Sequence, residues 1–194
     1  MDDKGNPRSR EKRIKNKKKK SNTRWVVTAF LLSFLISLVL SAATSDTVLD
    51  LVPVFASALI LIAIIALGIV FDIIGVAVTT ADIKPFNSMA ARKLKTGQKA
   101  VWLVNNAEKV SSFCNDIIGD IAGIVSGATG AAIAANLFTS DKFSHETAFF
   151  LTLALTSLIS ALTVGGKAMG KSVAIKHSTE IVTFSAKVLC GFKK

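Results

Sequence analysis

The stretch that decides the fold is the apolar run ALILIAIIAL at residues 58–67, part of an almost uninterrupted apolar segment from Val54 to Ala81. At about 1.5 Å of rise per residue, a helix of this segment is longer than the roughly 30 Å hydrocarbon core of a bilayer. Such a helix must tilt or emerge at its end. The segment therefore predicts a transmembrane helix, and this helix carries an acidic residue, Asp72, in its second half.

Three further apolar segments, residues 25–43, 111–137 and 149–165, have lengths close to that of a bilayer span. A hydrophobic fraction of 51% and a mean hydropathy of +0.50 are too high for an ordinary soluble domain. We therefore predict an all-α polytopic integral membrane protein. It has a three-helix core, a juxtamembrane helical hairpin and an extra N-terminal span.

The first span has two interpretations. It is either an uncleaved N-terminal transmembrane anchor, residues 25–44, or a signal peptide cut after the small residues Ser41-Ala42-Ala43. The apolar run is long for the h-region of a signal peptide, so the anchor is favoured. Either interpretation places residue 46 outside the cytoplasm.

Basic residues are unevenly distributed along the chain. Residues 1–24 hold eleven basic and three acidic side chains, and so supply +8 of the net charge of +11. We predict a disordered, cytoplasmic tail that contacts anionic lipid of the bilayer. A nucleic-acid partner is not expected, because no aromatic side chain is interleaved to stack on a base. With four spans, every Lys or Arg except Lys142 falls on one side, which predicts a multi-pass protein of the cell membrane with both termini cytoplasmic.

Between the second and third spans, residues 86–110 interleave apolar and basic side chains. This pattern predicts two short amphipathic helices along the membrane face, with Trp102 at headgroup level. About 25 residues are too few to bury a core of their own. In the third span, small residues recur at every fourth position, so a neighbouring helix can approach that face closely. They are Gly119, Gly123, Gly127, Ala131 and Ala135.

Residues 165–172, GGKAMGKS, satisfy the phosphate-binding pattern G-x-x-x-x-G-K-[ST]. That chemistry needs a strand before the loop and a helix of a βαβ unit after it, whereas a transmembrane segment precedes this stretch. We therefore expect no nucleotide, and interpret the glycines as a flexible helix end. His145, His177, Cys114 and Cys190 fall in no catalytic or metal-binding spacing, so we do not expect an enzyme.

Four segments together resemble the transmembrane domain of the CNNM/CorC (CorB) family of magnesium transporters. They are FDIIGVAVTTAD at 71–82, KL and GQKA within 93–100, SFCNDIIGD at 112–120 and VGGKAMGKSVAIKH at 164–177. The resemblance covers roughly residues 55–190 and assigns a domain of residues 51–190. It implies three core helices that begin outside the cytoplasm, a belt of juxtamembrane helices, a homodimer and magnesium transport. We expect the domain without the cytoplasmic CBS domains of the family.

The chain departs from the family where a cation would bind. The small hydroxyl residues and glutamate of the first-helix signature fall near Asp72, Ile74 and Gly75, and the second-helix asparagine matches Asp120. Lys167 stands where the third-helix motif carries a glutamate, and Gly170 stands where it carries a proline.

Three interpretations of the polar residues remain open. In the first, Asp72 and Asp120, with Asp116 on the same helix face as Asp120, hold Mg²⁺, an ion that prefers oxygen ligands and keeps several waters. In the second, Lys167 neutralises Asp120 or Asp72, and the protein is a non-transporting scaffold or regulatory relative. In the third, Asp116, Asp120 and Lys167 are solvated near the interface. The sequence favours a magnesium or divalent-cation transporter-like protein, with the scaffold as the alternative.

Overall fold

The computed structural model describes residues 25–42, 44, 53–138 and 144–191. The predicted basic tail, most of the first external turn and residues 139–143 of the second external loop lie outside the described residues. All of the regular structure described is helical, and no strand occurs in these ranges.

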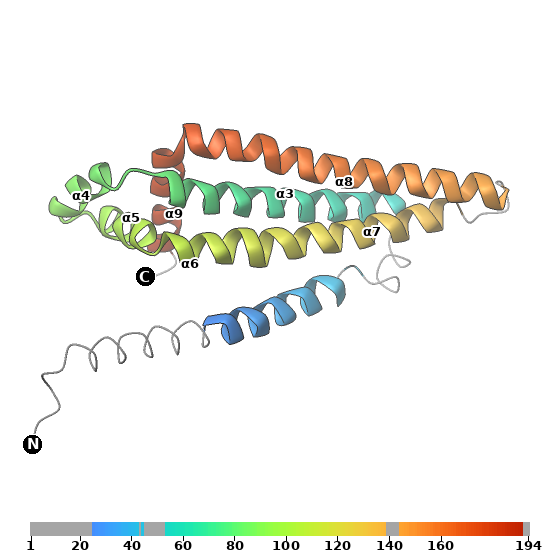
Figure 1. Cartoon of the computed structure of the whole chain (residues 1–194), viewed down its shortest axis with the longest axis horizontal. Coiled ribbons are helices and arrows are strands. Elements are labelled where there is room, and N and C mark those ends of the chain that lie inside the picture. Colours follow the sequence, from blue (N-terminus) through green and yellow to red (C-terminus); the bar gives the residue numbers. More distant parts are fainter. Residues whose placement is uncertain (1–24, 43, 45–52, 139–143, 192–194) are drawn as a thin grey trace, which may run out of the picture.

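Four helical segments are long and apolar enough to cross a membrane. They are the N-terminal helix Trp25–Ala42, α3 (Val54–Thr80), the continuous segment Ala107–Phe138 and α8 (His145–Lys176). The third segment consists of α6 (Ala107–Ser111), the π-helix η1 (Ser112–Gly119) and α7 (Asp120–Phe138). Figure 1 shows α3, α7 and α8 side by side in one long bundle. The prediction of an all-α polytopic membrane protein is confirmed.

The interpretation of the glycines at 165–170 as a flexible helix end was wrong, because α8 continues to Lys176. The glycines that suggested a flexible end instead allow α8 to pack closely on α3. A Cβ on Gly166 would lie 2.5 Å from Ile69 Cδ1, and a Cβ on Gly170 would lie 2.8 Å from Ile73 Cγ1. Larger side chains at these positions would force the two helices apart.

Three short helices, α4 (Lys84–Ala91), α5 (Lys95–Asn105) and α9 (Ser178–Gly191), lie together at one end of the bundle (Figure 1). The predicted amphipathic pair is present as α4 and α5. Its apolar side chains share a core with the end of α3 and with α9, since Phe86 and Val182 are both fully buried there. The hairpin thus obtains its core from the rest of the chain.

The small-residue stripe of the third span is only partly used within the chain. A Cβ on Gly127 would meet nothing within 4 Å, and one on Gly123 would meet only Lys167 Nζ, at 3.8 Å. The close helix contact is made instead at Gly130, where a Cβ would lie 2.6 Å from Ile159 Cδ1 of α8. Among the described residues no atom lies within 4 Å of a Cβ on Gly127, and the homodimer stays a prediction.

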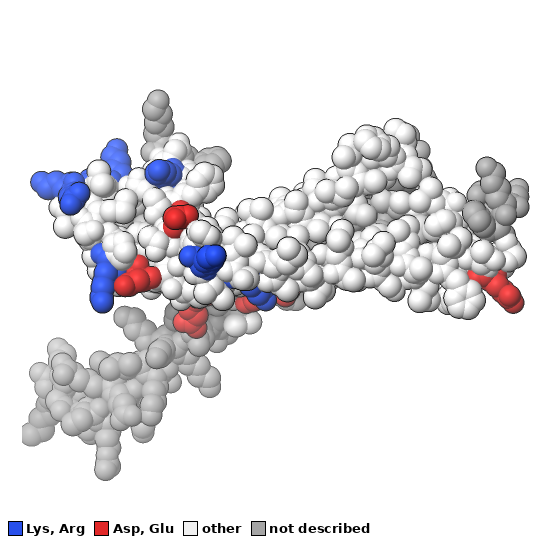
Figure 2. Space-filling model, turned by 90° about the horizontal axis from the view of Figure 1, so that it is seen from above, with Lys and Arg blue, Asp and Glu red and all other residues white. Residues whose placement is uncertain are grey.

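Charged side chains are concentrated at the ends of the bundle. Figure 2 shows the Lys and Arg side chains gathered at the end that carries α4 and α5, and a long middle that is almost entirely uncharged. We call this end the basic end. The uncharged middle is what a hydrocarbon environment requires. Which side of which membrane the basic end faces stays a prediction.

Candidate functional site

Asp72 is a buried carboxylate in the second half of α3, with only 4% of the residue exposed. Its Oδ2 atom accepts no hydrogen bond from the described part of the chain. The nearest opposite charge is Lys171 Nζ of α8, 3.9 Å from Oδ2, on a side chain that is 54% exposed. A carboxylate at this depth is costly, so it marks a candidate functional site.

Opposite Asp72, the backbone is widened into the π-helix η1. Asn115 of η1 packs directly on Gly75, where a Cβ would overlap the asparagine amide. Asn115 Nδ2 donates to Ser111 Oγ at 3.3 Å, while its buried Oδ1 has no hydrogen-bond partner among the described residues. π-Helical turns recur at functional sites because they break the regular ladder of helix hydrogen bonds.

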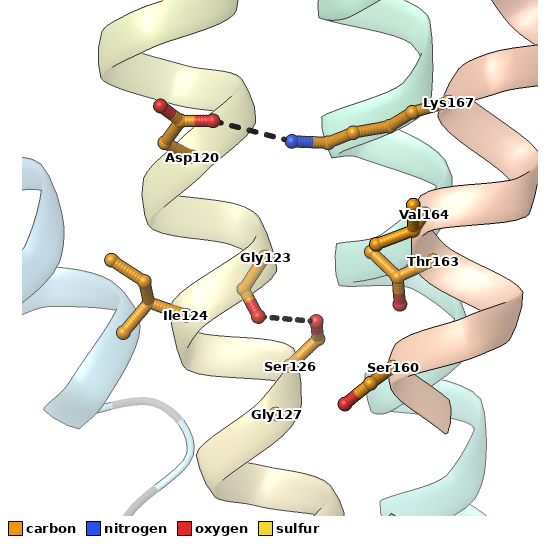
Figure 3. A pocket seen from close by; sticks show the side chains of 9 residues that line it. All are labelled: Asp120, Gly123, Ile124, Ser126, Gly127, Ser160, Thr163, Val164 and Lys167. Atoms are coloured by element: carbon orange, nitrogen blue, oxygen red, sulfur yellow. Dashed lines mark hydrogen bonds and ion pairs between the residues drawn. The ribbon is translucent and has the colours of Figure 1, made fainter. Parts of the chain in front are cut away.

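Lys167 reaches from α8 to the junction of η1 and α7 (Figure 3). Its Nζ donates to the Gly119 carbonyl oxygen at 2.8 Å and lies 3.4 Å from Asp120 Oδ1. The lysine side chain is 18% exposed, whereas that of Asp120 is 67% exposed. The contact with the carbonyl oxygen is therefore the shorter and more shielded of the two, so it holds the ammonium more firmly.

Gly119 lies between Asp72 and Lys167. A Cβ at this position would be 3.7 Å from Lys167 Nζ and 3.8 Å from Asp72 Oδ1. The absence of a side chain thus lets an ammonium and a carboxylate from different helices approach the same stretch of backbone. We call Asp72, Asp120, Lys167 and Lys171 the charge cluster. It contains two carboxylates and two ammonium groups, and it has no net charge.

A hollow of about 380 Å³ lies between α7 and α8, with Asp120 and Lys167 at one end (Figure 3). Its other polar side chains are hydroxyls. Ser126 Oγ donates to the Gly123 carbonyl oxygen at 3.0 Å, and Thr163 Oγ1 donates to the Ile159 carbonyl oxygen at 2.8 Å. Both hydroxyls are thus bonded to the backbone of their own helix, and both residues are buried.

The structure brings together some of the predicted metal ligands. Asp72 and Asp120 both join the charge cluster, whereas Asp116 accepts a hydrogen bond from Ser112 Oγ at 2.6 Å and is exposed. No three His, Cys, Asp or Glu side chains of the described ranges lie close enough to hold a metal ion. Magnesium ligation by Asp72, Asp120 and Asp116 stays a prediction.

Three groups at this site were not predicted from the sequence: Lys171, the Gly119 carbonyl oxygen and Asn115. Lys171 follows Lys167 by four residues, so the two lie on one helix face once α8 is known to continue past Gly165. The contact of the Gly119 carbonyl oxygen could not be predicted from residue types, because every residue has a backbone carbonyl. The position of Asn115 depends on the π-helix, which local propensity does not indicate.

Comparison with known proteins identifies no family. Scans of protein-family models, of curated proteins and of solved structures each return no match. The likeness to the CNNM/CorC family therefore stays a prediction from four sequence segments.

Proposed function

We propose that the protein is a non-transporting membrane relative of the CNNM/CorC type, in which lysine side chains take the place of a transported cation. The observation that carries this proposal is the 2.8 Å contact of Lys167 Nζ with the Gly119 carbonyl oxygen, beside Asp120. An ammonium group satisfies the same oxygen atoms that a metal ion would use. Because it is covalently attached, it does not leave the site as a transported ion must.

In this proposal the protein acts as a scaffold or regulatory subunit in the cell membrane, with the basic end in the cytoplasm. The gathering of Lys and Arg at that end supports the orientation (Figure 2), because short cytoplasmic segments are enriched in these residues. Gly127 supports a homodimer, because a Cβ there would meet nothing within 4 Å and a helix of a second copy could approach closely. The charge cluster then selects one register of α3, η1 and α8, at a cost in stability.

A second candidate function, transport of Mg²⁺ or another divalent cation as substrate, is favoured by two buried oxygens. Asp72 Oδ2 and Asn115 Oδ1 both lack a hydrogen-bond partner within the described ranges. Oxygen atoms of carboxylates and amides are the ligands that Mg²⁺ prefers, and the ion keeps several of its waters. In this candidate, Lys171 would have to move away from Asp72 when the ion arrives.

Flux measurements in proteoliposomes separate the two candidates. Proteoliposomes loaded with a Mg²⁺-sensitive dye contain the natural protein, Lys167→Glu or Asp72→Asn, and their Mg²⁺ uptake is compared. Lys176→Glu serves as the matched control, because it makes the same charge change at an exposed position of α8. We expect no Mg²⁺ flux from the natural protein. Flux that disappears in Asp72→Asn would overturn the proposal and establish transport.

Calorimetry tests the role of Lys167 directly. Lys167→Glu places a third carboxylate beside Asp120 and removes the competing ammonium. We expect Mg²⁺ binding to the detergent-solubilised Lys167→Glu variant, and none to the natural protein or to Lys176→Glu. Binding of Mg²⁺ by the natural protein with the same affinity as by Lys167→Glu would contradict the idea that lysine occupies the cation position.

The homodimer has its own test. Gly127→Leu should weaken self-association measured by energy transfer between labelled copies in bilayers. Gly165→Leu is the matched control, because a Cβ there also meets nothing within 4 Å but lies on α8. Equal association of both variants and the natural protein would exclude a dimer through the stripe.

A further inference from the structure

A second hollow, of about 650 Å³, lies at the basic end and is separate from the charge cluster. Its wall combines Trp25 of the N-terminal helix with residues of α3, α5, α6, η1 and α9. Apolar and aromatic side chains dominate it, among them Phe71, Phe113 and Leu189. A volume in the range of about 300–1,000 Å³ with a mostly apolar wall is typical of sites that hold a small organic molecule.

Both tryptophans of the chain line this hollow. Trp25 is the first described residue of the N-terminal helix, and Trp102 of α5 is 55% exposed. Tryptophan is enriched at the level of lipid headgroups, where one side of the ring is apolar and the N–H can reach a polar partner. Two tryptophans from distant segments therefore place the mouth of the hollow at a bilayer interface.

The lining of the hollow carries one charged side chain. Lys109 is the only charged side chain of its lining, and it is exposed at the rim. In the described part of the chain it forms no ion pair. The amide of Asn106 adds a polar group to the same lining. An apolar chamber with a single ammonium at its rim complements a molecule that has an apolar chain and an anionic head.

Two apolar side chains on the α9 wall of the hollow are exposed. Phe184 is 67% exposed and Leu189 is 41% exposed, although both line the hollow. At headgroup level these side chains would face water or polar headgroups, unless an apolar group fills the space between α9 and α5. The surrounding bilayer supplies such a group in the form of acyl chains.

We propose that this hollow binds one anionic phospholipid, with an acyl chain between α5, η1 and α9 and its phosphate group at Lys109. The site differs from a general attraction of anionic lipid to the basic residues 1–24, because it binds both the acyl chain and the phosphate group of one lipid. Binding would fix α9 and the start of the N-terminal helix relative to the bundle.

Tryptophan quenching by lipids with brominated chains tests the proposal, because Trp25 and Trp102 are the chain's only tryptophans. The full-length protein is placed in phosphatidylcholine nanodiscs that contain a minor fraction of either brominated phosphatidylglycerol or brominated phosphatidylcholine. We expect phosphatidylglycerol to quench at a several-fold lower content. Equal quenching by the two lipids would overturn the proposal.

Two variants and a control define the site. Lys109→Gln should reduce the preference for phosphatidylglycerol about fivefold, the factor expected for one lysine near a lipid headgroup. Lys95→Gln makes the same charge change at an exposed position of α5 outside the lining, and should leave the preference unchanged. An equal loss in both variants would show that only surface charge attracts the lipid, and would refute a defined site.

Filling the hollow tests the chain-binding part. Ser185→Phe adds an aromatic ring to the lining from α9 and should remove the selective quenching, while Lys109 is kept. If this variant retains selective quenching, no acyl chain lies in the hollow and the proposal fails. Should Ser185→Phe not fold, the comparison of Lys109→Gln with Lys95→Gln still decides the matter.

Discussion

Replacement of Asp72 by asparagine is the sharpest test of the charge cluster. The side chain keeps its size but loses its charge. An aspartate at the centre of a transmembrane helix disfavours insertion by about 2.5–3.5 kcal/mol, and the cost for Asp72 is smaller because this residue lies in the second half of α3. The structure offers Asp72 only limited compensation, because Oδ2 accepts no hydrogen bond from the described residues and Lys171 Nζ is 3.9 Å away.

The expected effect follows from these two terms. An ion pair with a half-exposed lysine contributes at most about 1 kcal/mol. An amide at the same position keeps part of the cost of burying a polar group. We therefore expect Asp72→Asn to raise the free energy of unfolding by about 1–2 kcal/mol. A natural residue that lowers stability in this way is typical of a position kept for function.

Titration of the detergent-solubilised protein with dodecyl sulfate, followed by far-UV circular dichroism, measures this free energy. Asp120→Asn is the matched control. Because the Asp120 side chain is 67% exposed, its change should stay within about 1 kcal/mol. Destabilisation by Asp72→Asn of more than about 1 kcal/mol would refute the reasoning, since it would mean that the pair with Lys171 outweighs the burial of the carboxylate.

Two further predictions concern packing. Gly68→Ala should destabilise the bundle by about 1–3 kcal/mol through overpacking, because its Cβ would lie 2.9 Å from Ala122 Cβ. Gly165→Ala is the control: its Cβ would meet nothing within 4 Å, and the variant should gain up to about 1 kcal/mol of helix stability. The same titration checks both, and equal stability of the two variants would contradict the contact. Phe86→Ala should lower the free energy of unfolding by about 3–5 kcal/mol, because Phe86 is fully buried. Phe150 is 70% exposed, so Phe150→Ala should change the free energy of unfolding by about 0.5 kcal/mol. A similar effect of both variants would show that Phe86 is not a core residue.

Part of the candidate site was predictable from the sequence and part was not. Asp72 and Lys167 stand out because charged residues are rare in apolar segments, and this signal needs no knowledge of neighbours. The partners of these two side chains were not predictable from the sequence. Lys171 approaches Asp72, and Lys167 approaches Gly119, across residues distant in sequence. Such pairs depend on how helices rotate and shift against one another, which a single sequence does not specify.

The sequence alone determined the helical class and the apolar segments able to span a bilayer. The length of an apolar run is a local property, and the thickness of the hydrocarbon core sets the length that a spanning helix needs. Only the tertiary structure decided which glycines serve close contact. Gly166 and Gly170 look like a helix end in the sequence, yet they lie inside α8 against Ile69 and Ile73. The low helix propensity of glycine therefore does not end the helix at these closely packed positions.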